Sequence, residues 1–295
     1  MKKAFSAVLV ALFLFTGCAG GPFDDTRLED ALAIGHKASL TPAWVQSQGF
    51  FLLVQSKFSN PDQPVRLYIE GDGFAYITSG RPAIDPTPHN PVALSLAAFD
   101  PSPNVAWIAR PCQYAMLAAT QRECPPKYWT THRMAPEVVA ALDEAVSALV
   151  KKSGSAQVEL VGYSGGGAAA VLLAARRKDV VTLRTVAGNL DNAAFIKHHD
   201  LSPMPESLDA KDVFDRVRDV PQLHFVGSED AIVLPSFSRE FVARIGGNAK
   251  EIVVEGREHI RGWSESWPRL LQMPLPADKA DSGCGIDKRK ALDSV

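Results

Sequence analysis

Short apolar runs alternate with longer amphipathic stretches through most of this chain. The runs are rich in aliphatic and aromatic residues, which favour strands, and they fall at 50–57, 65–70, 105–109, 158–161, 180–186, 222–227 and 250–255. Stretches that favour helices lie between them, at 92–99, 136–152, 168–176, 237–245 and 263–271. Because the two patterns alternate from residue 65 onward, the chain predicts an α/β fold: a mainly parallel sheet flanked by helices on both faces.

The same pattern divides the chain into segments. Residues 48–275 form the predicted α/β domain, a length that one domain can span. Residues 18–47 read as an N-terminal linker with a short helix near 28–34 and an edge strand. Residues 276–295 are polar and predict a disordered tail. Residues 192–219 predict short helices, enough for a small lid but too few for a large cap domain.

The first 17 residues have the pattern of a signal peptide. Lys2 and Lys3 precede an apolar run over 4–15, which is too short to span a bilayer comfortably. The run ends in Phe15-Thr16-Gly17-Cys18, which resembles a bacterial lipobox, although Phe15 stands where Leu is usual. The resemblance implies a lipid on Cys18 and, with Ala19 rather than Asp next, an outer-membrane lipoprotein facing the periplasm. An ordinary secretory signal is the alternative.

Charge and cysteine content narrow the choice of partner and compartment. The formal net charge is −2, and no basic stripe or helix is present, so we expect no nucleic-acid partner. With Cys18 lipidated, Cys112, Cys124 and Cys284 remain in an oxidising compartment. Cys112 and Cys124 are close in one irregular stretch and predict a disulfide, which would contribute about 3 kcal/mol in the chain-entropy model. Three free thiols are the alternative.

One segment has the pattern of a catalytic turn. Gly162-Tyr163-Ser164-Gly165-Gly166 follows an apolar strand and precedes an Ala- and Leu-rich helix. The glycines allow the tight strand–turn–helix that raises a serine clear of the sheet edge. The helix N-terminus would direct free N–H groups at the same point. Ser164 is therefore a candidate nucleophile, with a structural turn as the alternative.

Acyl transfer also needs an oxyanion hole with two N–H donors. The N–H of Gly165, directly after the candidate nucleophile, would be the first. The second commonly comes from a glycine-rich loop after an early strand, the place occupied by Glu70-Gly71-Asp72-Gly73. We expect the donor to be the N–H of Asp72, with Gly73 as the alternative. An ordinary turn would explain these glycines equally well.

An acid and a histidine follow later strands. Asp230 comes just after the strand at 222–227, and His259 follows the final strand at 250–255. Because parallel strands end at one edge of a sheet, both can reach Ser164. Asp191, after the strand at 180–186, is a rival acid. We expect three other histidines, His89 and the adjacent pair His198 and His199, to be surface residues. We also expect no metal or organic cofactor.

Serine, then acid, then histidine is the chain order of the α/β-hydrolase superfamily, which residues 48–272 resemble, with bacterial envelope lipoproteins of that fold as the most similar type. The resemblance depends on Gly162–Gly166, Gly227-Ser228-Glu229-Asp230 and Glu258-His259. It implies a Ser164-Asp230-His259 triad that hydrolyses small-molecule or lipid carboxylic esters through an acyl-enzyme. An amidase, peptidase or thioesterase, or a non-catalytic scaffold, are the alternatives. The chain departs from the superfamily at Glu70-Gly71, where His-Gly is common.

Overall fold

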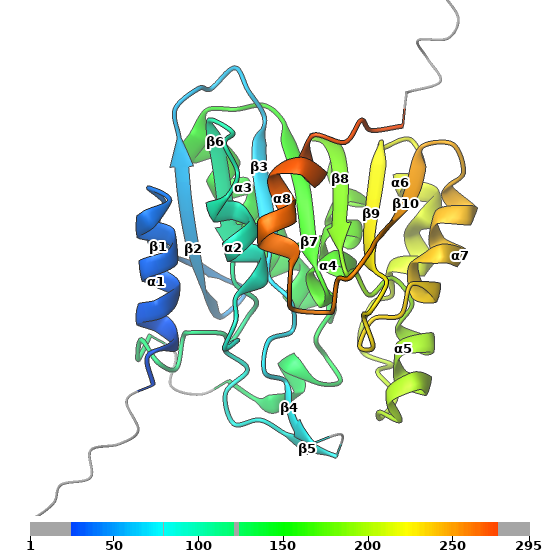
Figure 1. Cartoon of the computed structure of the whole chain (residues 1–295). Coiled ribbons are helices and arrows are strands. Elements are labelled where there is room, and N and C mark those ends of the chain that lie inside the picture. Colours follow the sequence, from blue (N-terminus) through cyan, green and yellow to red (C-terminus); the bar gives the residue numbers. More distant parts are fainter. Residues whose placement is uncertain (1–24, 79, 121–123, 277–295) are drawn as a thin grey trace, which may run out of the picture.

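An eight-stranded sheet runs through the molecule, in the order β1-β2-β6-β3-β7-β8-β9-β10 (Figure 1). The computed structural model describes residues 25–78, 80–120 and 124–276. The sheet strands are β1 (Thr41–Ser47), β2 (Phe50–Phe58), β3 (Val65–Ile69), β6 (Asn104–Ile108), β7 (Val158–Tyr163), β8 (Val180–Val186), β9 (Gln222–Gly227) and β10 (Ala249–Val254). The predicted signal peptide, the lipobox-like motif with Cys18, Cys284 and the predicted tail from 277 onward lie outside the described residues.

The sheet is parallel from β6 to β10 and antiparallel at one side. β3 pairs in parallel with β6 and β7, and the parallel pairing continues through β8, β9 and β10. β2 pairs antiparallel with both β1 and β6. This confirms the mainly parallel sheet, and β1 is the edge strand expected before residue 48. The α/β sheet therefore begins at Thr41, a few residues earlier than the domain boundary drawn from the sequence.

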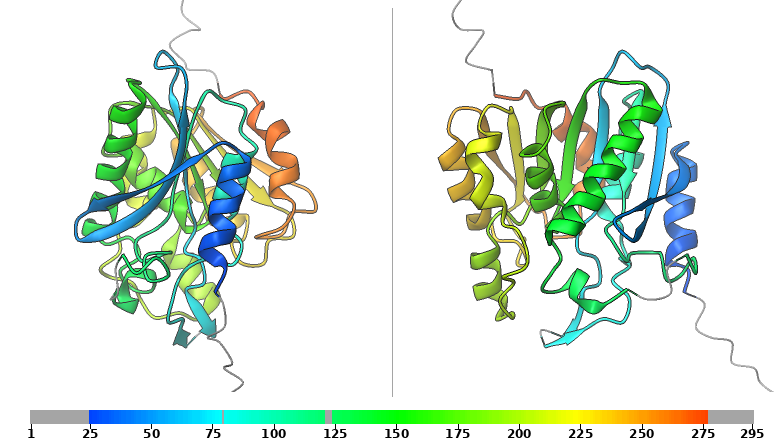
Figure 2. Two further views of the ribbon diagram at one scale, coloured as in Figure 1. Left: turned by 90° about the vertical axis from the view of Figure 1, so that its left-hand side faces the viewer. Right: turned by 180° about the vertical axis from the view of Figure 1, so that it is seen from behind.

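Helices cover both faces of the sheet, as expected (Figures 1 and 2). α1 (Arg27–Lys37), α2 (Val92–Ala98) and α8 (Trp263–Leu271) pack on one face around Trp107, Trp263 and Trp267. The opposite face carries α3 (Pro136–Ser153), α4 (Gly165–Ala174), the 3-10 turn η2 (Ala210–Val213) with α6 (Phe214–Val217), and α7 (Ser236–Ile245). Figure 2 shows α3 and α4 lying across the sheet from behind. Each face thus has its own apolar core.

The local sequence explains the longest helix. Val138, Leu142, Val146 and Leu149 recur at helical spacing, and all four are buried. The helix ends at Gly154, whose φ of 75° is the left-handed conformation that glycine adopts without a steric penalty. Lys151 and Lys152 lie in the last turn, where positive charge is favourable. α3 therefore covers the segment that periodicity predicted.

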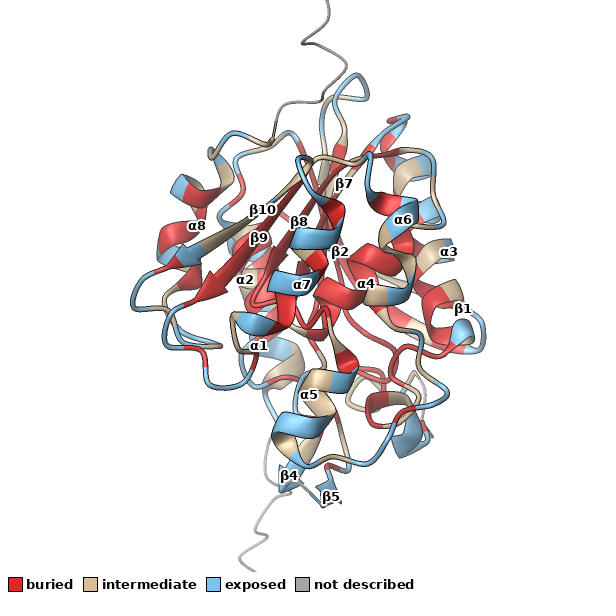
Figure 3. Ribbon diagram, turned by 90° about the vertical axis from the view of Figure 1, so that its right-hand side faces the viewer, coloured by how far each residue is buried: buried red, intermediate tan, exposed pale blue. Residues whose placement is uncertain are grey.

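Most residues of the inner strands of the main sheet are buried, as Figure 3 shows in red. Every residue of β6 and β9 is buried, because helices cover both sides of each strand. α4 is equally enclosed: all ten of its residues are buried, and its glycines and alanines let it pack closely on the sheet. The helix behind Ser164 is therefore a fully buried part of the core.

Beyond the carboxyl ends of the parallel strands lie short elements and loops. They include the hairpin β4 (Tyr76–Thr78) and β5 (Arg81–Pro82), the 3-10 turn η1 (Pro126–Trp129) and α5 (Asn192–His199). Figure 1 shows β4, β5 and α5 together at this end of the molecule. These elements form no large cap domain. Across the described ranges, no helix combines the length and the apolar character needed to cross a membrane.

Candidate active site

Ser164 occupies a strained turn between β7 and α4. Its φ of 52° and ψ of −123° are unusual for a residue with a side chain. The surroundings enforce this conformation, since a Cβ at Gly162 would collide with the backbone of Gly166 and Gly167, and one at Gly166 would collide with the carbonyl groups of Ile69 and Glu70. The glycines are therefore required by close packing, as the turn pattern predicted.

The structure brings Ser164, His259 and Asp230 into one hydrogen-bonded chain. His259 Nδ1 lies 2.9 Å from Asp230 Oδ2, and His259 Nε2 lies 3.0 Å from Ser164 Oγ. A carboxylate can only accept, so Nδ1–H donates to Asp230, and the neutral imidazole then accepts the Ser164 hydroxyl proton at Nε2. This is the geometry of an activated nucleophile, a base and an orienting acid.

Asp230 is held firmly, and the rival acid has a different role. The second oxygen of Asp230 accepts hydrogen bonds of 2.8 Å from the backbone N–H groups of Ile232 and Val233, and its side chain is fully buried. Asp191 instead caps α5 by accepting from Ala194 N–H at 3.0 Å, and it also pairs with Lys211. The contacts thus separate two acids that strand position alone left open.

Two aromatic residues hold the backbone of His259, and neither was singled out from the sequence. The Tyr163 hydroxyl and the Trp263 indole N–H each donate to His259 O at 3.0 Å. The Tyr163 ring also lies 5.3 Å from the imidazole, centroid to centroid. Tyr163 is the variable position before Ser164 in the turn motif, so the motif itself could have pointed to it. Together these contacts fix the approach of the imidazole to Ser164.

The loop Gly71–Gly73 lies beside the turn that carries Ser164, where the sequence predicted an oxyanion donor. A Cβ at Gly71 would come within 3.2 Å of Ser164 Cβ, and one at Gly165 would collide with the Asp72 carboxylate. Gly165 begins α4, so its N–H has no partner within the helix. The loop and the helix start therefore flank Ser164 as the sequence predicted.

Glu70, at the start of this loop, is a buried carboxylate with a structural role. Its oxygens accept hydrogen bonds of 3.0–3.3 Å from four N–H groups: the amides of Gly71, Ala93 and Leu94 and the indole of Trp107. Burial raises the pKa of Glu70, and these donors oppose the shift. Glu70 thus caps the start of α2, where the residue at the cap position, Pro91, makes no side-chain hydrogen bond. Glu70, which stands where the superfamily commonly has His, therefore links the loop to α2.

Asp72 forms ion pairs with two arginines that the sequence did not reveal. Arg110 Nη1 lies 3.2 Å from one Asp72 oxygen, and Arg133 Nη1 lies 2.8 Å from the other. Both guanidinium groups are buried, and Arg110 also donates to the carbonyl of Arg133. Gln113 Nε2 donates to Gly71 O at 2.9 Å. These contacts tie the loop to two irregular segments that follow β6.

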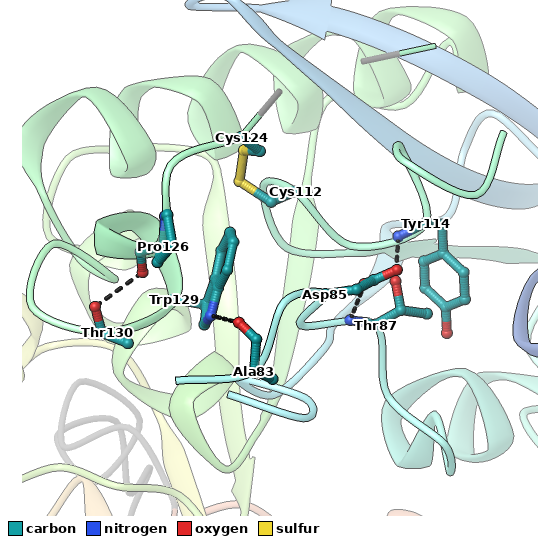
Figure 4. Close-up of a disulfide and its surroundings, with 9 residues drawn as sticks. All are labelled: Ala83, Asp85, Thr87, Cys112, Tyr114, Cys124, Pro126, Trp129 and Thr130. Carbon is teal, nitrogen blue, oxygen red and sulfur yellow. Dashed lines mark hydrogen bonds between the residues drawn. A yellow bond between two sulfur atoms is a disulfide. The ribbon is translucent and has the colours of Figure 1, made fainter. Parts of the chain in front are cut away.

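A disulfide closes the irregular segment between those arginines (Figure 4). The structure joins Cys112 to Cys124, the predicted pair, with 5.7 Å between their Cα atoms. Nearby, Trp129 Nε1 donates to Ala83 O and Tyr114 N donates to Thr87 Oγ1, as Figure 4 shows. The bridge therefore lies where the chain has little regular structure of its own to hold it.

A cavity of about 510 Å³ opens beside Ser164. Aromatic and aliphatic side chains form much of its wall, among them Phe74, Tyr76, Phe195, Leu201, Ile232 and Ile260. His89 and His199 also line it. The predicted surface position is confirmed for His89 and for His198, which are both exposed. His89 is exposed but packs on Phe74, and His199 is half-buried with Nε2 2.7 Å from Ile232 O. The described residues contain no cluster of His, Cys, Asp and Glu suited to a metal ion.

Comparison with solved structures agrees with this fold. Est1E from Butyrivibrio proteoclasticus aligns with a TM-score of 0.54 at 13% identity, over 78% of this chain and 97% of its own. An alpha-beta serine hydrolase homologue from Coxiella burnetii aligns with 0.51 at 16%, over 78% and 93%. The esterase domain of a Rhodothermus marinus protein aligns with 0.51 at 15%, over 78% and 94%. At such identities the likeness establishes the fold.

The sequence itself provides the family. No curated protein matches this chain. Residues 100–260 match the serine hydrolase (FSH1) family, a span that contains Ser164, Asp230 and His259 and begins after the Gly71–Gly73 loop. The chain therefore belongs to the FSH1 serine hydrolase family and has the α/β-hydrolase fold.

Proposed function

We propose that this protein hydrolyses carboxylic esters with Ser164, Asp230 and His259 as its catalytic triad. The observation that carries the proposal is the unbroken hydrogen-bond chain from Asp230 through His259 to Ser164, with distances of 2.9 and 3.0 Å. Both steps fall within the range in which a base can take the proton of a nucleophile. Family membership supports the general class, and the triad supplies the chemistry.

The reaction follows from these positions. Ser164 Oγ attacks the ester carbonyl carbon while His259 Nε2 takes its proton, and the proton then passes to the departing alcohol. The buried Asp230 carboxylate orients the imidazole and stabilises the imidazolium. Water, deprotonated by His259, then attacks the acyl carbon. The bond from this carbon to Ser164 Oγ breaks, His259 returns the proton to Oγ, and the acid is released. This mechanism uses no metal or organic cofactor.

The tetrahedral oxyanion would be bound by the N–H of Gly165 and by an N–H of the Gly71–Gly73 loop, with Asp72 as the first choice. Two observations support this assignment. Gly165 begins a helix, where the N–H groups are free, and the loop packs directly against Ser164. The Asp72 carboxylate would oppose a nearby oxyanion, but two guanidinium groups neutralise it.

The proposed setting is the bacterial cell envelope, with Cys18 carrying the lipid anchor of an outer-membrane lipoprotein that faces the periplasm. The lipobox-like Phe15-Thr16-Gly17-Cys18 motivates the anchor. The Cys112–Cys124 disulfide is consistent with the periplasm, because disulfides form and persist in oxidising compartments. Cys18→Ser should move the protein from the membrane fraction to the soluble fraction. Unchanged membrane partition of that variant would reject the anchor.

Covalent trapping tests the proposed reaction. With p-nitrophenyl acetate we expect a burst of p-nitrophenol and an acyl adduct on Ser164, and a fluorophosphonate probe should label the same residue. Ser164→Ala should lose all three signals while its unfolding transition stays near that of the wild type. A folded wild-type protein with neither burst nor label would favour a non-catalytic scaffold. Faster turnover of matched amides or thioesters would assign it to those classes instead.

A further inference from the structure

Arg133 lies in the wall of the cavity beside Ser164, although it is only 3% exposed. Its Nη1 donates to Asp72 at 2.8 Å, and its guanidinium lies over the Phe195 ring, 4.9 Å from the centroid. Its other terminal nitrogen, Nη2, is buried and has no hydrogen-bond partner within the described part of the chain. A buried donor without an acceptor costs free energy, so such a group calls for an explanation.

Among the residues that the structure describes, the ion pairs around Arg133 leave one cation unmatched. Asp72 is a single carboxylate shared by two guanidinium groups, those of Arg110 and Arg133. Two further acids of the site, Glu70 and Asp230, have partners of their own. Glu70 accepts from four N–H groups, and Asp230 accepts from His259 and two amides. Of the two arginines, Arg133 lines the cavity and Arg110 does not.

We infer that Arg133 binds an anionic group of the substrate, so that the enzyme prefers esters that carry a carboxylate. A guanidinium offers several N–H donors in a plane, which suits a carboxylate. The wall beside it is formed by Phe195 and Tyr76, so the substrate would join an apolar segment to one anionic end. The inference rests on the proposed ester hydrolysis, because it names the substrate class of the same cavity.

The carboxylate could belong to the acyl group or to the leaving alcohol, and two pairs of esters separate these sources. Mono-p-nitrophenyl succinate is compared with p-nitrophenyl butyrate for the acyl side. 4-Acetoxybenzoate is compared with phenyl acetate for the alcohol side. In each pair the readout is the ratio of kcat/KM for the anionic ester to that for the neutral ester, which cancels any general loss of activity.

Arg133→Gln should lower this ratio about 10- to 100-fold for one of the two pairs, mainly through KM, as the loss of a hydrogen bond to a charged group predicts. Arg133→Lys should restore part of it, because the charge returns without the planar fork. Arg110→Gln is the matched control, since it also removes a partner of Asp72 but lies outside the cavity wall. Arg110→Gln should lower kcat/KM for both esters of a pair by the same factor and so leave the ratio unchanged.

Equal ratios in the wild type and Arg133→Gln, with fluorophosphonate labelling intact, would overturn the inference and leave the proposed reaction standing. A binding measurement tests the inference even if the protein does not hydrolyse esters. Monomethyl succinate and 4-acetoxybenzoate should each be titrated against Ser164→Ala by calorimetry. At least one should bind, and adding Arg133→Gln should weaken it about 10-fold or more. No binding of either, or equal binding by both variants, would also overturn the inference.

Discussion

The two sides of the proposed active site are built in different ways. On one side Ser164, Asp230 and His259 follow β7, β9 and β10, and their residue types and chain order are those of the proposed triad. On the other side Asp72 and the two buried arginines Arg110 and Arg133 form an ion-pair cluster with no recognisable sequence pattern. Asp72 and Arg110 also follow strands closely, so a position at a strand end does not explain the difference.

What differs is how each side constrains its residue types. The triad needs a nucleophile, a base and an acid in one order, so few residues in the chain qualify. An ion pair needs only opposite charges that meet after folding, and this chain has 31 basic and 33 acidic residues. The triad can therefore be sought in a sequence, whereas the cluster becomes visible only in three dimensions.

The largest effect should come from the triad acid. Asp230→Asn should lower kcat for p-nitrophenyl acetate about 10⁴-fold, because the imidazole would lose its orienting partner and adopt the wrong tautomer. Asp191→Asn is the control at another strand end, and it should change kcat far less, since Asp191 caps α5 instead. A reversal of these two results would mean that the acid belongs to β8 rather than β9.

The charge cluster should rank second. Asp72→Asn leaves two buried guanidinium groups without a carboxylate, and their repulsion should shift the Gly71–Gly73 loop. We expect kcat to fall about 10²- to 10³-fold, the scale of a lost oxyanion donor, together with a lower free energy of unfolding.

Asp143→Asn serves as the matched control for Asp72→Asn. Asp143 also pairs with an arginine, Arg177, but its side chain is 30% exposed, so this ion pair should contribute below about 1 kcal/mol. If Asp72→Asn behaved like this surface variant in both kcat and unfolding, the cluster would have no part in catalysis.

Removing the disulfide should show how much it stabilises the irregular segment beside the cluster. Replacing Cys112 and Cys124 together by Ser should lower the free energy of unfolding by about 3 kcal/mol in the chain-entropy model. Denaturant unfolding measures this, and dithiothreitol should destabilise the wild type but not the double variant. Equal stability with and without reductant would show that the bridge does not constrain the segment.

A smaller effect should come from His224, in the buried strand that leads to Asp230. Burial lowers the pKa of His224 to about 3, so the folded state keeps it neutral, whereas in the unfolded chain it titrates near 6.5. Below pH 6.5 the unfolded state binds the extra proton, so stability falls as pH drops, at up to about 1.4 kcal/mol per pH unit, until the pH nears 3. At pH 5 the loss should be about 2 kcal/mol.

His224→Gln should make the free energy of unfolding depend less on pH, by a slope that corresponds to about one proton. Denaturant unfolding at pH 7, 6 and 5 measures this slope. His224 Nδ1 lies 2.9 Å from Thr185 Oγ1, a contact that a glutamine amide could also satisfy. Identical pH slopes in the variant and the wild type would show that His224 protonates without unfolding.

Much of the fold could be predicted from the sequence because the sheet and its helices follow from local patterns. Apolar runs predicted each of the seven strands from β2 to β10 that belong to the main sheet, and periodicity predicted α3 almost to its ends. The residues of the turn at Ser164 predict its geometry, because glycines are needed at 162 and 166 where the strand and the helix pack so closely. Candidates for the acid and base then followed from chain order.

Tertiary structure decided the features that depend on contacts between distant segments. Glu70 reads as an acid near the site, yet folding encloses it with four N–H donors and makes it the cap of α2. The sequence predicted no more than a surface position for His89 and His199, and folding brings both to one cavity. Asp72 meets Arg110 and Arg133 across 38 and 61 residues of chain. Hydrophobic periodicity reports which face of an element is buried, but the partner of a buried charge depends on which loops meet it, and no local pattern records that.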